Sequence, residues 1–125
     1  MIDYSQENEQ HHILAACPEN HGRFLDIGAW HPTAKSNTRA LFEQGWDGVC
    51  IEPSPGPFAN LLAEYGRTPQ RVALYHAAVA RTSGSCMFWI TDDATSTCDP
   101  DIYRKWSGTV KYNVKQVEVP TITLE

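Results

Sequence analysis

The sequence predicts a single α/β domain with three parallel strands joined by crossover helices, and an antiparallel pair of strands at the rim. Three short apolar runs, at residues 23–27, 48–52 and 71–80, alternate with two helical segments at 36–44 and 57–65. The connections are short enough for right-handed crossovers, which place successive strands parallel. A chain of 125 residues suits one domain with one modest core.

The chain begins with a predicted helix and a predicted strand. Residues 5–17 are expected to form a helix that ends before Pro18, followed by a turn at 20–22. Residues 23–27 form a short apolar strand that ends at Gly28. Runs this short, bounded by turn residues, suit strands that are buried on both faces.

Two helices are expected to connect the three strands. Ser36 is a favourable N-cap residue, so a helix is predicted from there to Gln44, and Gly45 suits the left-handed position that ends it. Pro57 suits the first turn of the second helix. The apolar residues that recur along one face of that helix are Phe58, Leu61, Leu62 and Tyr65.

The chain changes character after residue 80. Residues 86–91 and 115–123 are predicted strands that pair antiparallel with each other, separated by a long polar loop at 92–108. Pro120 cannot donate to a strand ladder, which predicts that it lies at an edge or a bulge. Aromatic side chains of this region could cover a ligand or pack over an apolar edge; they are Tyr103, Trp106 and Tyr112.

Composition and charge exclude several classes of function. The formal net charge of −5 argues against a nucleic-acid partner, which would need a basic patch. No apolar run approaches the roughly 18 residues of a membrane span. The polar residues 1–10 are not a signal peptide, so a cytoplasmic protein without a membrane partner is expected. The four cysteines lack CxxC spacing, so neither a metal site nor a disulfide framework is expected.

Acidic residues end two of the predicted strands. Ligands of open α/β sheets bind at the carboxyl ends of the strands. Gly28 follows such a strand end, where a glycine permits a tight turn and the close approach of a ligand. Asp26 could accept hydrogen bonds from a cationic ligand or orient the loop, and a plain turn is the alternative. Glu52, 26 residues later, can accept both ribose hydroxyls of a nucleoside; a solvated carboxylate is the alternative.

The turn after the first strand lacks the glycines of a dinucleotide site. Such a site needs G-x-G-x-x-G, whose glycines admit a pyrophosphate to a helix N-terminus. Residues 28–33 contain only the first glycine, and Trp30 and Pro32 would crowd a pyrophosphate. There is no GxxxxGK[ST] phosphate-binding loop either. A nucleoside without a pyrophosphate therefore fits better than NAD or ATP, which disfavours a nicotinamide-dependent oxidoreductase.

The ordered set of motifs resembles the FkbM-type methyltransferases over residues 4–125. The matching segments are Tyr4-Ser5-Gln6, Phe24-Leu25-Asp26-Ile27-Gly28-Ala29, Ser36-Asn37-Thr38, Gly45-Trp46, Gly48-Val49-Cys50-Ile51-Glu52-Pro53, Ala77-Ala78-Val79 and Val119-Pro120-Thr121-Ile122-Thr123-Leu124-Glu125. The resemblance implies a Rossmann-like class I methyltransferase fold with S-adenosylmethionine as cofactor. It also implies O-methylation of a sugar or another small-molecule substrate.

The resemblance also implies roles for particular residues. The cofactor turn would be formed by Asp26, Gly28 and Ala29, with Trp30 beside it. Glu52 would hold the ribose, and Pro53 would shape its loop. The remaining cofactor-binding residues would be Ser36, Asn37 and Thr38 in the following helix and Ala77 and Ala78 near the adenine. Pro32 departs from the glycine that many family members have, and no catalytic residue is assigned.

The resemblance covers the cofactor-binding part of the family's fold, whose C-terminal half is missing here. That half normally supplies the later strands and much of the acceptor site. Without its usual neighbour, strand 24–27 would be an exposed apolar edge, so we expect a homo-oligomer that covers this edge. The alternative to an enzyme is a non-catalytic cofactor-binding or oligomer-forming module.

Several other polar residues are open to more than one interpretation. His31, beside the turn, could act as a general base, and a structural role is its alternative. His76 lies inside an apolar run, which predicts a hydrogen-bonded core residue. Asp92 and Asp93 could bind a cation or a substrate amine, or belong to a solvated loop. His11-His12 is expected on a solvated helix face, because adjacent helical residues do not face each other.

Overall fold

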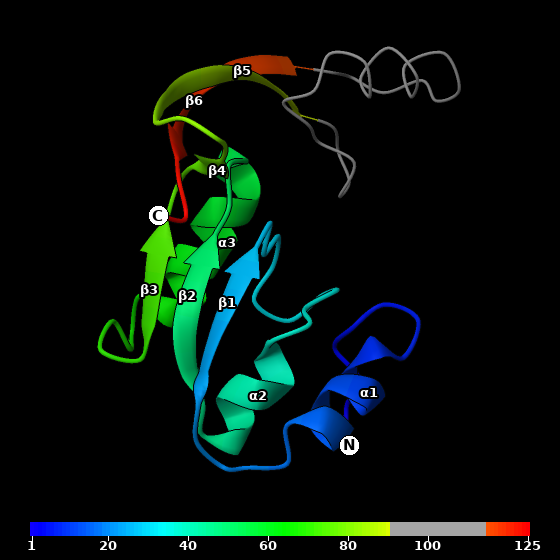
Figure 1. Ribbon diagram of the computed structural model, residues 1–125. Coiled ribbons are helices and arrows are strands. Elements are labelled where there is room, and N and C mark those ends of the chain that lie inside the picture. The colour runs from blue at the N-terminus through cyan, green and yellow to red at the C-terminus, as the bar shows by residue number, and fades with distance from the viewer. Residues whose placement is uncertain (91–114) are drawn as a thin grey trace.

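The structure, a computed structural model, describes residues 1–90 and 115–125. These residues form an α/β structure with two separate three-stranded sheets (Figure 1). The first sheet is parallel, in the order β1 (Arg23–Ile27), β2 (Asp47–Ile51) and β3 (Val72–Tyr75). Three parallel strands with crossover helices were predicted, and this part of the fold is confirmed.

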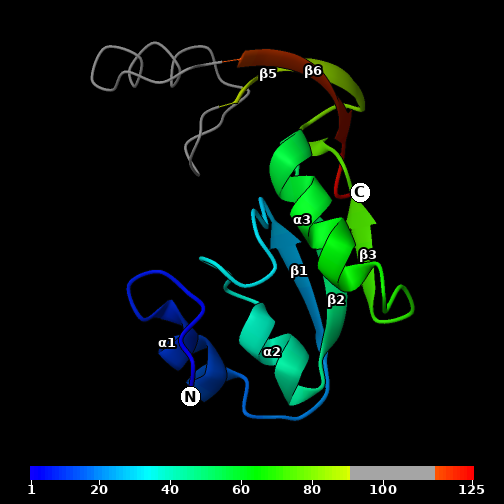
Figure 2. The ribbon, with the colours of Figure 1, turned by 180° about the vertical axis from the view of Figure 1, so that it is seen from behind.

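Helices α2 (Arg39–Gln44) and α3 (Pro55–Tyr65) pack on one face of this sheet, and α1 (Glu9–Ala16) lies beside α2 (Figure 1). Figure 2 shows α3 in front of the sheet, and Figure 1 shows it behind. The core is formed where strand side chains meet helix side chains, by Phe24, Cys50 and Val72 with Leu41, Leu61 and Tyr65. Two right-handed crossovers that proceed in the same direction along a sheet place both helices on the same side.

The opposite face of the parallel sheet is open along its two outer strands. Leu25 and Ile27 of β1 are 52% and 50% exposed, and Tyr75 of β3 is 50% exposed. These side chains alternate with the buried ones, as the two-residue period of a strand requires. The expectation that the strands are buried on both faces is therefore wrong for β1 and β3, because both crossover helices lie on the other side. At the end of β2 it is confirmed, since the neighbouring residues Cys50 and Ile51 point to opposite faces and are both buried.

Two helices begin later than predicted. α1 starts at Glu9 instead of residue 5, because Glu7 and Asn8 have positive φ angles of 48° and 64°, which an α-helix does not tolerate. α2 starts at Arg39, with Thr38 at the N-cap. Ser36 still contributes, since its Oγ accepts a hydrogen bond from the Arg39 N–H at 3.0 Å.

The second sheet was not expected as a separate unit. It consists of β4 (Ala78–Val79), β6 (Lys115–Ile122) and β5 (Gly84–Ile90), in that order. The antiparallel pairing of β5 with β6 is confirmed, but the pair does not join the rim of the parallel sheet. The predicted strand 71–80 divides after Tyr75, so that β3 and β4 belong to different sheets.

The middle strand of this second sheet contains Pro120. It lies opposite Ser85 of β5, and β4 pairs with β6 only from Thr121 onward. The missing N–H of Pro120 therefore faces no partner on the β4 side. Cys86 of β5 is disulfide-bonded, so the expectation of no disulfide is wrong at this position, whereas Cys50 is a free thiol.

Some sequence-based expectations concern residues that lie outside the described ranges. These are the polar loop 92–108, the pair Asp92 and Asp93, and the aromatic side chains that follow. Within residues 1–90 and 115–125, no helix is long and apolar enough to cross a membrane.

Replacement of Gly48 by Ala is expected to destabilise the fold by about 1–3 kcal/mol, because overpacking a core displaces its side chains. A Cβ at this position of β2 would lie 2.4 Å from Cδ1 of the Phe24 ring. Urea denaturation measures the change. Gly56→Ala is the matched control, since no atom lies within 4 Å of a Cβ there. Equal stability of both variants would contradict this packing.

Candidate functional site

A pocket of about 200 Å³ lies at the carboxyl ends of β1 and β2. Its described lining comes from the turn after β1, the segment after β2, and the second sheet. The lining residues are Ile27, Gly28, Trp30, Ile51, Glu52, Pro53, Ser54, Ala77, Ala78, Val79 and Phe88. This is the edge of a parallel sheet at which ligands bind in open α/β structures.

The turn after β1 directs its backbone N–H groups toward β2. The N–H groups of Gly28 and Ala29 both donate to the Ile51 carbonyl oxygen, at 2.8 and 3.2 Å. The next N–H, that of Trp30, donates to Oε1 of Glu52 at 2.9 Å. Trp30 has a φ of 64°, a costly conformation for a bulky residue, and this hydrogen bond stabilises it. These three N–H groups are therefore not offered to a ligand.

Glu52 connects the two walls of the pocket. Its side chain is 3% exposed, and its Oε2 accepts a hydrogen bond from the Ser54 N–H at 2.7 Å. Burial raises the pKa of Glu52, while hydrogen bonds from the Ser54 and Trp30 N–H groups and the nearby His76 lower it. Each carboxylate oxygen accepts one backbone N–H, and each can accept a further hydrogen bond.

The hydroxyl of Ser54 is buried beside this carboxylate. Among the described residues this hydroxyl has no partner at hydrogen-bonding geometry. It is nevertheless close enough to the Glu52 carboxylate to lower the pKa of Glu52. Ser54 is the N-cap of α3, whose first and third residues are Pro55 and Pro57. Prolines have no N–H, so Gly56 carries the single free N–H of this first turn, and the helix end is a poor anion site.

Asp26 lies at the end of β1 but does not line the pocket. Its Oδ2 accepts a hydrogen bond from the Thr38 hydroxyl at 2.6 Å. Burial raises the pKa of Asp26, and the bond from Thr38 lowers it. Asp26 thus orients the segment before α2, one of the two roles that the sequence left open.

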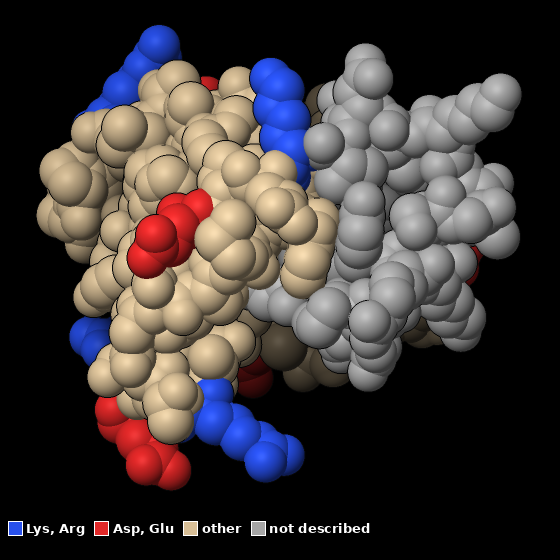
Figure 3. Space-filling view, turned by 90° about the horizontal axis from the view of Figure 1, so that it is seen from above, with Lys and Arg blue, Asp and Glu red and all other residues tan. Residues whose placement is uncertain are grey.

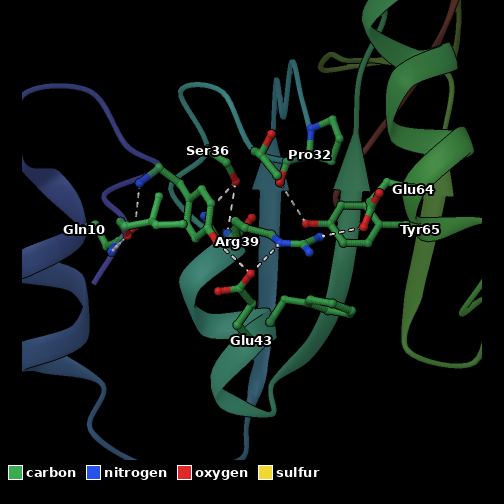
Figure 4. Close-up of polar contacts among 12 residues, drawn as sticks. Gln10, Pro32, Ser36, Arg39, Glu43, Glu64 and Tyr65 are labelled. Atoms are coloured by element: carbon green, nitrogen blue, oxygen red, sulfur yellow. Dashed lines mark hydrogen bonds and ion pairs between the residues drawn. The ribbon is translucent and has the colours of Figure 1, made fainter.

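The loop between β1 and α2 is held by a polar cluster (Figure 4). The Tyr65 hydroxyl of α3 donates to the Pro32 carbonyl oxygen at 3.3 Å, and burial raises the pKa of Tyr65 to about 12. Arg39 lies between Glu43 and Glu64, 3.3 Å from each carboxylate. The cluster ties the loop to both α2 and α3.

His31 stabilises the same loop from within. Its Nδ1 accepts hydrogen bonds from the N–H groups of Thr33 and Ala34, at 3.1 and 2.9 Å. Nδ1 is therefore engaged as an acceptor and is not available to remove a proton from a substrate. The geometry favours the structural interpretation of His31 over that of a general base.

The structure brings together six of the predicted cofactor-binding residues. These are Gly28, Trp30, Glu52, Pro53, Ala77 and Ala78. The other five do not line the pocket: Ala29 is in the core, Asn37 is exposed, and Ser36, Thr38 and Asp26 form the loop contacts described above.

Several lining residues had not been identified from the sequence. Ser54 follows directly after Glu52 and Pro53, so its position in the loop was an available signal. Phe88 of β5 is 5% exposed and reaches the pocket only because the second sheet packs over the end of the first. Nothing in an alternating strand pattern indicates that packing.

Charged side chains do not gather into a basic patch on the face seen from above. In the part of that face that the structure describes, Lys, Arg, Asp and Glu are scattered among uncharged residues (Figure 3). Among the described residues, no group of three or more His, Cys, Asp or Glu side chains is arranged to hold a metal ion.

Comparisons with protein-family models, with curated proteins and with solved structures found no match to this chain.

Replacement of Thr38 by Val is expected to lower the free energy of unfolding by about 1.5–3 kcal/mol at pH 7, since a hydrogen bond to a buried carboxylate is lost. Burial raises the pKa of Asp26 in the folded protein, so its ionisation lowers the free energy of unfolding at pH values above that pKa. This destabilisation disappears as the pH falls below the pKa of Asp in an unfolded chain, about 3.9. The loss should therefore be smaller at pH 4. Urea denaturation at both pH values measures it.

Thr38→Ser keeps the hydroxyl donor and is the control for this substitution. It should retain most of the stability at pH 7. If Thr38→Val loses the same free energy at both pH values, the bond to ionised Asp26 is not the cause.

Proposed function

We propose that the chain binds S-adenosylmethionine in this pocket, as the cofactor-binding part of a methyltransferase with a Rossmann-like class I fold. The observation that carries the proposal is the buried Glu52 carboxylate, held by two backbone N–H groups with a lone pair left on each oxygen. This arrangement suits the two neighbouring hydroxyls of a ribose. The resemblance to FkbM-type methyltransferases supports the same assignment.

The surroundings of Glu52 favour a nucleoside over a phosphate-bearing nucleotide. The N–H groups of the turn are engaged by Ile51 and Glu52, and the prolines of α3 leave one free N–H there. A pyrophosphate would find few donors and a carboxylate close by. These contacts disfavour NAD, and with it a nicotinamide-dependent oxidoreductase.

The other described walls are apolar. Ile51, Ala77 and Phe88 supply surface on which a flat base can be buried. When bound, S-adenosylmethionine supplies an electrophilic methyl group, and its sulfonium charge is favoured in a pocket whose one ionisable described side chain is the acidic Glu52. The residues of the pocket hold the donor in place for an acceptor, and proximity then provides most of the rate enhancement. The acceptor we propose is a hydroxyl of a sugar or small metabolite.

A second candidate function is binding without catalysis. Glu52 is the one ionisable side chain among the described lining residues, and the proposal assigns its carboxylate to the ribose. A general base for an acceptor hydroxyl is therefore not found among them. Binding of S-adenosylhomocysteine without methyl transfer to any sugar acceptor would favour this non-catalytic module.

Calorimetric titration is expected to detect binding of S-adenosylhomocysteine and not of NAD. Glu52→Gln should weaken that binding by about 1.5–3 kcal/mol, because hydrogen bonds to a charged acceptor are lost. Glu9→Gln removes a charge from an exposed position of α1 outside the pocket lining and should leave the affinity unchanged. Failure of the unmodified protein to bind S-adenosylhomocysteine would refute the cofactor assignment.

We also propose that a second copy of the chain covers β1. This strand is at the edge of the parallel sheet, and its Leu25 is half exposed. An apolar edge strand is prone to pair with another strand. Light scattering is expected to show a homo-oligomer that Leu25→Glu dissociates.

Leu62→Glu is the control for the oligomer, because Leu62 is equally exposed, at 53%, but lies on α3. It should not change the oligomeric state. A wild-type protein that stays monomeric at high concentration contradicts the proposal.

A further inference from the structure

The rim of the pocket contacts an exposed histidine. His76 follows β3 and precedes the lining residues Ala77 and Ala78. Its side chain is exposed, so the prediction of a core residue is wrong, but the predicted hydrogen bond is present. Nε2 lies 3.1 Å from the Pro53 carbonyl oxygen. A carbonyl oxygen can only accept, so Nε2 carries the proton and donates it.

The orientation of the imidazole is set by a stacking contact. The ring of His76 lies parallel to that of Phe58 on α3, with 8° between the planes and 4.6 Å between the centroids. The stack fixes the direction in which Nε2–H points. His76 thus links the end of β3 to α3 and to the segment between β2 and α3.

One planar peptide group is held at both ends by this contact and by Glu52. The carbonyl of Pro53 and the N–H of Ser54 belong to the same peptide bond, which is rigid. His76 binds its oxygen at 3.1 Å, and Oε2 of Glu52 binds its N–H at 2.7 Å. Rotation of this plane would break both hydrogen bonds, so the contact with His76 also fixes the donor that orients Glu52.

We propose that His76 is a positioning residue for the ligand pocket, which acts through the Pro53–Ser54 peptide group to hold the carboxylate of Glu52 in place. The effect on ligand affinity rests on the proposed function, whereas the effect on the peptide group does not. The hydrogen bond, and not the ring stack alone, is the essential part.

Two substitutions separate the hydrogen bond from the stack. His76→Gln retains an N–H donor with the reach of Nε2 but loses the aromatic ring, and His76→Phe retains a ring over Phe58 but has no donor. His76→Ala removes both. His12→Ala, at an exposed position of α1, controls for the loss of a surface histidine.

Two quantities are measured for each variant: the Kd for S-adenosylhomocysteine by calorimetry, and the hydrogen-exchange rate of the Ser54 N–H by NMR. We expect His76→Ala and His76→Phe to raise the Kd about 5- to 10-fold, the equivalent of one hydrogen bond, and to speed exchange. His76→Gln and His12→Ala should remain close to the wild type in both.

The outcomes distinguish this inference from the proposed function. If His76→Phe matches the wild type while His76→Gln does not, the stack is the essential contact and the inference is overturned. If the wild type does not bind S-adenosylhomocysteine, the proposed function fails, and exchange at Ser54 alone decides. Unchanged exchange in both His76→Ala and His76→Phe would then overturn the positioning role.

Discussion

The carboxylate of Glu52 is the contact on which the organisation of the pocket depends. Burying a charge is costly unless it is hydrogen-bonded, and here two backbone N–H groups meet that need. One comes from the turn after β1 and the other from the segment that starts α3. Because both loops converge on one side chain, the strained conformation of Trp30 and the N-cap of α3 are maintained together.

The path of the chain explains the one-sided packing. β1, β2 and β3 follow one another in space in the same order as in sequence, so both crossover helices lie on a single face. The core forms there, around Phe24 and Tyr65, while Leu25 and Ile27 face outward. Because β1 and β2 are parallel neighbours, their carboxyl ends lie side by side, and residues of the second sheet line the same pocket.

Local features were the most predictable from the sequence. The strands were located to within a residue or two at β1 and β2, because apolar runs there are bounded by glycine and proline. Gly28 and Glu52 were found because they end such strands. The break between β3 and β4 was missed, since a single polar residue within an apolar run, His76, does not reveal a change of sheet. Phe88 was missed because its place in the pocket depends on how two sheets pack.

The separation of β3 from β4 by two residues has a consequence for the energetics of the domain. The first sheet ends at Tyr75, residues 77–79 line the pocket, and Ala78–Val79 already form β4 of the second sheet. Any molecule that contacts both Glu52 and Phe88 would join the two sheets. Its binding free energy would then oppose local opening of the second sheet. The population of molecules with an opened second sheet would fall as the concentration of that molecule rises.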